Sequence, residues 1–419
     1  MVLDHWQGGR LPPDLIYLIV KLCSDDRTTL LSCSFVSFVW RQIASRRLFT
    51  KLTAIPSLSD KSLEALCLFL DSCSNLHLKV THLTIAPAGP NESDSDSLEV
   101  VPLPILATAL AKLPHLLHLH LSRVRVVPWP VYQLSSFPPK PSIQLDSLRL
   151  IASAIDYDDP DFPWEALAHL LPLFLAIRHL DLDTVHAVYT QRSPRYTRGL
   201  PPIPHRTQVQ SLYLSEYTHF GLCTQLSRTI LANYLVSLQL GYADSGDVLV
   251  RSTYSDAFRV FPHIKRLELF LAARSIISTP LDLQPAPRTI ESIHYKFPTL
   301  DTDDMTSLNT FNNAWEHVLA SLSIVPSTLP LATVSIQATV PRMFLGDRYG
   351  NRWIRWDALA LCLLKLPALR AVKVDLVVVP QTPPRELVQE FVDYFQHGFD
   401  EIHPVFDRER CPAFEIIVS

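Results

Sequence analysis

The residues best suited to chemistry in this 419-residue chain are two histidines, His118 and His120, in the segment LLHLHL. Two residues apart on a β-strand, they would face the same side, a spacing that can bind a metal ion. The same segment alternates polar and apolar residues, which is typical of a strand with one solvated face, and we favour that interpretation over a metal site. The acidic run at 156–162 has no defined separation between its carboxylates, so we expect a solvated loop there.

Common catalytic motifs are missing from the sequence. It contains no G-x-S-x-G nucleophile turn, no G-x-x-x-x-G-K-[ST] phosphate loop, no H-E-x-x-H zinc helix and no G-x-G-x-x-G turn. Glycine is scarce, with 10 residues against 34 prolines, which disfavours loops that cradle phosphates. We therefore expect a protein that is not an enzyme and uses no cofactor; an enzyme that uses histidines of a sheet face is the minor alternative.

The composition indicates which classes of partner and which cellular compartment to expect. Lysine and arginine total 37 against 41 acidic residues, for a formal net charge of −4, so we expect no nucleic-acid and no membrane partner. The seven cysteines form no C-x-x-C pair, which indicates free thiols in a reducing compartment. No signal peptide is visible, and the longest apolar run, near residue 170, is too short to span a bilayer. These features predict an intracellular protein, cytoplasmic, nuclear or both.

The first fifty residues predict three short helices. Pro12 and Pro13 stand where a helix can begin, and apolar residues then recur at helical spacing. The Ser-Asp-Asp break at 24–26 offers a cap for a second helix, and Ser37 offers one for a third. Because such a small helical unit cannot bury much core by itself, we expect part of it to contact a partner or a neighbouring domain.

This order of features resembles the F-box, the helical module that docks a protein onto the Skp-type adaptor of a cullin ubiquitin ligase. The resemblance rests on LPPDLI, the acidic break and LLSCSFVSFVW, and it assigns residues 8–52 to the module. It implies that seven residues contact the adaptor: Leu11, Pro12, Leu15, Ile16, Ile19, Val36 and Trp40. The family's usual arginine after Val-Ser is Phe38 here. The alternative is that these residues form the core of a terminal helical cap.

A short apolar-x-x-apolar-x-apolar pattern recurs through the rest of the chain. Its central apolar residues lie roughly thirty residues apart, the signature of a repeat architecture. They are Leu83, Leu119, Leu148, Leu180, Leu212, Leu238, Leu267, Ile293, Val334 and Val372. Helical patterns such as PILATALAKL and WDALALCLLKL separate the repeats. A strand, a helix and another strand in succession predict an α/β fold with a parallel sheet.

This second part, residues 53–419, resembles an irregular leucine-rich-repeat-like α/β solenoid, as found after many F-boxes. Loop insertions are expected near 87–99, 189–207 and 340–356. The family's turn asparagine or cysteine is replaced here by residues such as Val124, Ser153 and Val185, so the turns need other hydrogen bonds and the curvature is left open. The arginines and tryptophans of 340–356 fit either a binding site or a turn whose Trp356 begins a helix; we favour the turn.

In each predicted strand the residue between the last two apolar positions points away from the core. These residues, all polar or amphipathic, are Thr84, His120, Arg149, Asp181, Tyr213, Gln239, Glu268, His294, Ser335 and Lys373. We interpret Thr84 and Ser335 as part of the wet face and the other eight as the candidate target surface. The sequence thus predicts a non-catalytic receptor that links an unknown protein substrate to a Skp/cullin ligase. The alternative is a structural scaffold that does not engage the ligase.

Overall fold

The computed structural model shows an α/β protein built on one large parallel sheet. It describes residues 11–24, 26–72, 78–88, 98–129, 143–157, 164–189, 205–215, 222–242, 257–271, 286–297, 305–339, 354–377, 385–406 and 411–418. Most of the three predicted insertions, at 89–97, 190–204 and 340–353, lies outside these residues, as do the acids at 158–162. The coarse prediction of an α/β fold with a parallel sheet is confirmed.

Three helices open the chain, as the proline and capping residues predict. They are α1 Pro13–Leu22, α2 Arg27–Ser34 and α3 Phe38–Leu48. The Asp26 carboxylate accepts hydrogen bonds from the N–H groups of Thr28 and Thr29 at 3.0 and 3.1 Å, and so caps α2. Ser37 caps α3 by accepting from the N–H of Trp40. Side-chain capping therefore sets where α2 and α3 begin, and α1 begins at the proline pair without a side-chain cap.

Twelve strands follow one another across the large sheet in chain order, all parallel. They are β1 Lys51–Ala54, β2 His82–Ile85, β4 His118–Ser122, β6 Ile143–Ile151, β8 Phe174–Asp183, β10 Gln208–Leu214, β11 Ser237–Tyr242, β12 Arg266–Leu271, β13 Ser292–Lys296, β14 Thr333–Thr339, β15 Ala371–Val377 and β16 Ala413–Val418. Because β1 begins at Lys51, the last two residues of the segment predicted as 8–52 belong to the sheet.

The register of this sheet follows the sequence repeat. Each of the ten central apolar residues lies directly beside the next, from Leu83 beside Leu119 to Val334 beside Val372. Leu52 of β1 and Phe414 of β16 extend the same row at its two ends. A slip of one residue would turn this apolar row to the opposite face, so burial of the row fixes the register.

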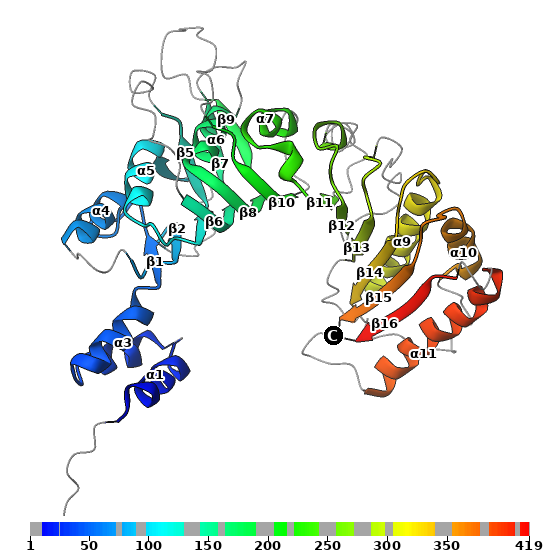
Figure 1. The fold of residues 1–419 in the computed structure, drawn as a ribbon, viewed down its shortest axis with the longest axis horizontal. Helices are drawn as coiled ribbons and strands as arrows, with labels where there is room; N and C mark the ends of the chain where they lie inside the picture. Colours follow the sequence, from blue (N-terminus) through cyan, green and yellow to red (C-terminus); the bar gives the residue numbers. More distant parts are fainter. Residues whose placement is uncertain are drawn as a thin grey trace, which may run out of the picture.

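Helices connect the strands and cover one face of the sheet. They are α4 Leu63–Ser72, α5 Leu103–Ala111, α6 Glu165–Leu170, α7 Leu222–Thr229, α9 Met305–Ser323, α10 Trp356–Leu364 and α11 Arg385–Ile402. The strands line the inner side of an arc and α5, α6, α7, α9 and α10 lie on its outer side (Figure 1). The apolar residues of the strands face the helices and form one continuous core with them. We call the opposite, helix-free side of the sheet the inner face.

A second, smaller parallel sheet was not predicted. Its strands are β3 Glu99–Pro102, β5 Val124–Val127, β7 Ala154–Tyr157 and β9 His186–Tyr189, in that order. Each of the last three follows a strand of the large sheet after a sharp turn at Arg123, Ala152 or Thr184, which have φ values of 52°, 47° and 53°. None of these residues is glycine, the usual signal for left-handed backbone, so the sequence does not reveal the turns.

Backbone groups at these turns are bonded between neighbouring repeats. The N–H of Arg123 donates to the carbonyl of Ile151, and the N–H of Ala152 donates to that of Asp183, both at 2.9 Å. The buried Ser153 hydroxyl donates to Ile151 O at 2.9 Å and accepts from the Val124 N–H. These bonds satisfy backbone groups of the turns that follow the strands.

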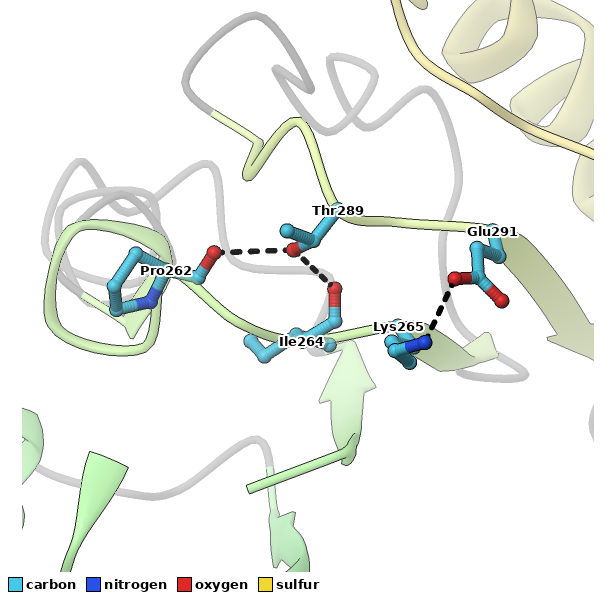
Figure 2. A network of polar contacts seen from close by, with 5 residues as sticks. All are labelled: Pro262, Ile264, Lys265, Thr289 and Glu291. Atoms are coloured by element: carbon cyan, nitrogen blue, oxygen red, sulfur yellow. Dashed lines mark hydrogen bonds and ion pairs between the residues drawn. The ribbon is translucent and has the colours of Figure 1, made fainter. Parts of the chain in front are cut away.

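At the other end of the strands, one carbonyl often accepts two successive N–H groups of the next repeat. The Lys265 carbonyl, for example, bonds the N–H groups of Glu291 and Ser292 at 2.8 and 3.1 Å. Figure 2 shows the side-chain bonds that accompany this arrangement between β12 and β13. The Thr289 hydroxyl lies within hydrogen-bond distance of the carbonyls of Pro262 and Ile264, and Lys265 forms a 2.9 Å ion pair with Glu291.

The C-terminal end of the arc is closed by α11 and β16 (Figure 1). The rings of Phe395 and Phe399 pack edge-on against Trp356, whose indole lies at the start of α10. Trp356 is buried, which confirms that it begins the core face of a helix. Gly398 lies so close to this indole that a Cβ atom would be 2.0 Å from Trp356 Cε2. Glycine is therefore required by packing rather than by backbone conformation.

Replacement of Gly398 by alanine tests this close approach. In an open helical site the change would stabilise the protein by up to about 1 kcal/mol, because glycine is a poor helix former. Here the overlap with Trp356 should instead lower the free energy of unfolding by about 1–3 kcal/mol, measured by urea denaturation. Glu390→Ala, on an exposed position of the same helix, is the control and should change it by less than about 0.5 kcal/mol. A stabilised Gly398→Ala variant would contradict the packing.

Two buried histidines should make the folded protein less stable in mild acid. Burial lowers the pKa of His169 and of His317 to about 4. In the unfolded chain both histidines titrate near 6.5, so the unfolded state binds more protons than the folded state between pH 6.5 and 4. The free energy of unfolding therefore falls as the pH drops through this range. The decrease is roughly 3 kcal/mol for each histidine. His169→Gln with His317→Gln should flatten this dependence in urea titrations. A slope that stays the same in the double variant would contradict this cause.

Candidate functional site

The three N-terminal helices have a small core of their own. Ile16, Val20 and Leu30 form its buried cluster, which is separate from the core of the large sheet, and Ala44 of α3 is buried as well. Trp40 and Ile43 of α3 are half-buried and pack against it. The Arg47 guanidinium donates to the Tyr17 hydroxyl at 3.1 Å and so ties α3 to α1. A core this small leaves most apolar side chains of the module on its surface.

We call these exposed side chains the module apolar surface. They are Leu11, Leu15, Tyr17, Leu18, Ile19, Leu22, Leu31, Phe35, Val36, Phe38 and Val39. Among them Leu22, Phe35, Phe38 and Val36 are the most open, at 88, 79, 70 and 65% exposed. An exposed apolar surface of this kind is more often a protein-interaction site than a surface that merely faces solvent.

The seven residues assigned to adaptor contact do not all reach this surface. Leu11, Pro12, Leu15, Ile19 and Val36 are exposed. Ile16 is buried in the module core at 4% exposed, which corrects its assignment to the contact surface. Trp40 lies half-buried against the same core and offers only part of its indole. One helical turn separates Ile16 from Val20, so these two form the inward stripe of α1, and Leu15, Ile19 and Leu22 face outward.

The sequence interpretation missed several members of the module apolar surface, mainly Leu18, Leu22, Phe35 and Val39. All lie in segments too short and too uniformly apolar for periodicity to separate the inward from the outward side. Phe38 was noted only as a departure from the family's arginine, yet its ring is among the most exposed apolar groups. A surplus of apolar residues over what three short helices can bury was the available signal.

The candidate target surface forms one unbroken row across the inner face. His120 lies beside Arg149, Arg149 beside Asp181, Asp181 beside Tyr213, and the row continues in the same way to Lys373. Thr84 and Ser335 are members of the same row. Neighbours in this row are 26 to 41 positions apart in the sequence, as the repeat pattern predicts.

Ion pairs organise the charged members of this row. Arg149 Nε lies 2.9 Å from Asp181 Oδ2, on the neighbouring strand. Glu268 lies between Arg266 Nε at 2.9 Å and Lys296 Nζ at 3.0 Å. Burial raises the pKa of the Asp181 carboxyl, and the hydrogen bond from Arg149 opposes this increase. Each buried acid on this face therefore depends on a basic neighbour.

Three histidines of the inner face, His82, His118 and His120, lie on the neighbouring strands β2 and β4. The rings of His82 and His118 stack with centroids 4.2 Å apart, and His118 Nδ1 lies 2.8 Å from the Ser147 hydroxyl. Burial lowers the pKa of His82 and His120, and neighbouring charges, His118 beside His82 and Arg149 beside His120, lower it further. Within the described ranges, no group of three or more histidine, cysteine, aspartate or glutamate residues is arranged to hold a metal ion.

Comparisons with known proteins add no family to these observations. No family model matches the chain, and no curated protein matches it. In the part of the chain that the structure describes, no helix has the length and apolar character needed to cross a membrane.

Arg149→Gln tests the dependence of Asp181 on its partner. Without the guanidinium, the half-buried carboxylate loses its hydrogen-bonded cation, and the free energy of unfolding at pH 7 should fall by about 1–3 kcal/mol in urea titrations. The pKa of Asp181 should rise further, so this loss should shrink as the pH falls through the raised pKa and the carboxyl takes up a proton. The control is Lys265→Gln, which removes a cation from an exposed ion pair at the sheet rim; its effect should stay below about 1 kcal/mol. A loss independent of pH would contradict the argument.

Proposed function

We propose that this protein is a substrate receptor of an SCF-type ubiquitin ligase. In this proposal the N-terminal helices are an F-box-like module that binds a Skp-type adaptor. The following strands and helices are an irregular leucine-rich-repeat-like solenoid that presents a protein target. The observation that carries the proposal is the module apolar surface. Its eleven large apolar side chains are exposed on a module whose own core is very small.

Exposure of these side chains to water in the free protein is costly, and association with an apolar partner removes that cost. Burial of apolar area contributes about 25 cal/mol for each Å² removed from water. Leu11, Leu15, Ile19 and Val36, which the F-box resemblance assigns to adaptor contact, are all members of this surface. Physical exposure and resemblance thus indicate the same face, with Ile16 as the exception.

A receptor of this kind performs no bond chemistry. It raises the local concentration of a target near a ubiquitin-charged enzyme by binding both at once. The curved inner face, with its continuous row of polar side chains, is suited to hold the target. Such a role is exercised inside the cell, in the cytoplasm, the nucleus or both, and it needs neither a cofactor nor a nucleic-acid partner. A scaffold that never binds the adaptor is the competing proposal.

Adaptor binding provides the test. Purified protein should retain a Skp-type adaptor in a pull-down, and Leu15→Asp with Val36→Asp should reduce retention by about 100-fold or more, because two carboxylates would enter an apolar interface. Both positions are exposed, so the variant should keep its circular dichroism spectrum and melting temperature. Leu361→Asp places the same charge at an exposed position of α10 and should bind normally. Wild-type protein that fails to retain the adaptor would favour the scaffold.

A further inference from the structure

Acids and bases on the inner face differ in how far they reach solvent. Glu268 is 4% exposed, while its two partners Arg266 and Lys296 are 55% and 28% exposed. The Arg149–Asp181 pair shows the same asymmetry, at 53% and 19%. At the edge strand β16 the Lys373–Glu415 pair is the exception, with both groups about equally open. Acids therefore form the floor of the central face and cations stand above them.

The Glu268 site holds more positive than negative charge. One carboxylate contacts two cations, each through a single nitrogen, and cannot neutralise both. Among the residues that the structure describes, Glu268 is the acid that pairs with these cations, so the other guanidinium nitrogens of Arg266 and the other protons of the Lys296 ammonium can bind an anion. A carboxylate so buried is stable only while paired, so it holds the two cations in position before a ligand arrives.

An aromatic group adjoins these cations. Lys296 Nζ lies 4.6 Å from the centre of the Phe270 ring, and the Tyr213 ring meets Phe270 edge-on at 5.4 Å. Gly241 of the intervening strand β11 is the register neighbour of Phe270. The rings of Tyr213 on β10 and Phe270 on β12 thus meet across the intervening strand β11. Cations and a pair of aromatic rings therefore share one place on the inner face.

We propose that this place binds an acidic segment of the target protein, in which an aromatic or aliphatic residue neighbours an aspartate or glutamate. The apolar side chain packs on Phe270 and Tyr213, and the carboxylate accepts hydrogen bonds from Arg266 and Lys296. This inference rests on the proposed function for its biological role, but the binding itself does not require the adaptor. We call the four residues the acidic-segment site.

The geometry also gives the length of the segment. Arg149 stands on β6, four strand steps from β12, which corresponds to about 19 Å at about 4.8 Å for each step. An extended peptide covers about 3.4 Å for each residue, so a second carboxylate placed five or six residues away reaches Arg149. A nucleic acid fits less well, because Asp183 and Asp375 also face inward and the chain carries a net charge of −4.

Fluorescence anisotropy with a defined peptide tests the site in the full-length protein. The probe is a fluorescein-labelled, amidated glycine–serine peptide that contains one Asp-Phe pair and a second aspartate about five residues away. We expect saturable binding below about 1 mM that weakens with salt, and at least about tenfold weaker binding when asparagine replaces both aspartates or alanine replaces phenylalanine. Equal binding of the asparagine peptide, or no binding at all, would overturn the proposal.

Variants locate the binding on the molecule. Arg266→Gln with Lys296→Gln should weaken binding at least about tenfold. Because this change leaves Glu268 unpaired, the triple variant that adds Glu268→Gln removes the buried charge as well and should show the same loss. The control is Lys265→Gln with Lys112→Gln, which also removes two positive charges, one at the rim of the sheet and one on its helical side. Its peptide binding should stay within about twofold of that of the wild type. Binding that survives in the triple variant would overturn the site.

Two further measurements separate competing explanations. All of these variants should retain the Skp-type adaptor as the wild type does, so loss of peptide binding cannot arise from failure of the module. Conversely, peptide binding by a protein that retains no adaptor would support the acidic-segment site and oppose the proposed ligase role. A single-stranded oligonucleotide should compete poorly; competition that exceeds that of the peptide, and that the triple variant abolishes, would assign the site to nucleic acid instead.

Discussion

Parallel hydrogen bonding between successive repeats is the constraint on which the rest of this structure depends. Each inner strand of the large sheet bonds to the strand before it and the strand after it in the chain, and to no other strand of that sheet. Single carbonyls such as that of Lys265 accept two N–H groups of the next repeat, which ties the entry points of neighbouring strands together. A parallel connection requires a crossover, and here a helix or a long loop supplies it. The order, direction and register of the sheet follow.

Register makes the two faces of the sheet chemically different. The row that begins at Leu83 is apolar and packs against helices, so the adjacent row must face the opposite way. Because that opposite face carries no helices, its side chains include ion pairs such as Arg149–Asp181 and Arg266–Glu268–Lys296. The same ladder that buries leucine therefore assembles the acidic-segment site from three separate strands.

The N-terminal module is stabilised differently from the sheet. Its helices are set by local capping at Asp26 and Ser37, but its core is limited to Ile16, Val20 and Leu30 with a few flanking side chains. No ladder continues from the sheet into this module, and its core does not merge with the sheet core. The apolar side chains left over are the physical reason to expect a partner, and they make the module the part most suited to assembly.

By itself the sequence determined the α/β class, the parallel strands, the ten apolar markers, the helix caps and the row from His120 to Lys373, because all of these arise from periodicity and short-range chemistry. It could not determine the second sheet, since its turns use Arg123, Ala152 and Thr184 instead of glycine. It also could not show that Ile16 turns inward, that Glu268 lies beneath Arg266 and Lys296, or that the ring of Tyr213 reaches Phe270 across β11. Those features depend on distances between strands and on depth below the surface, and only the tertiary structure defines them.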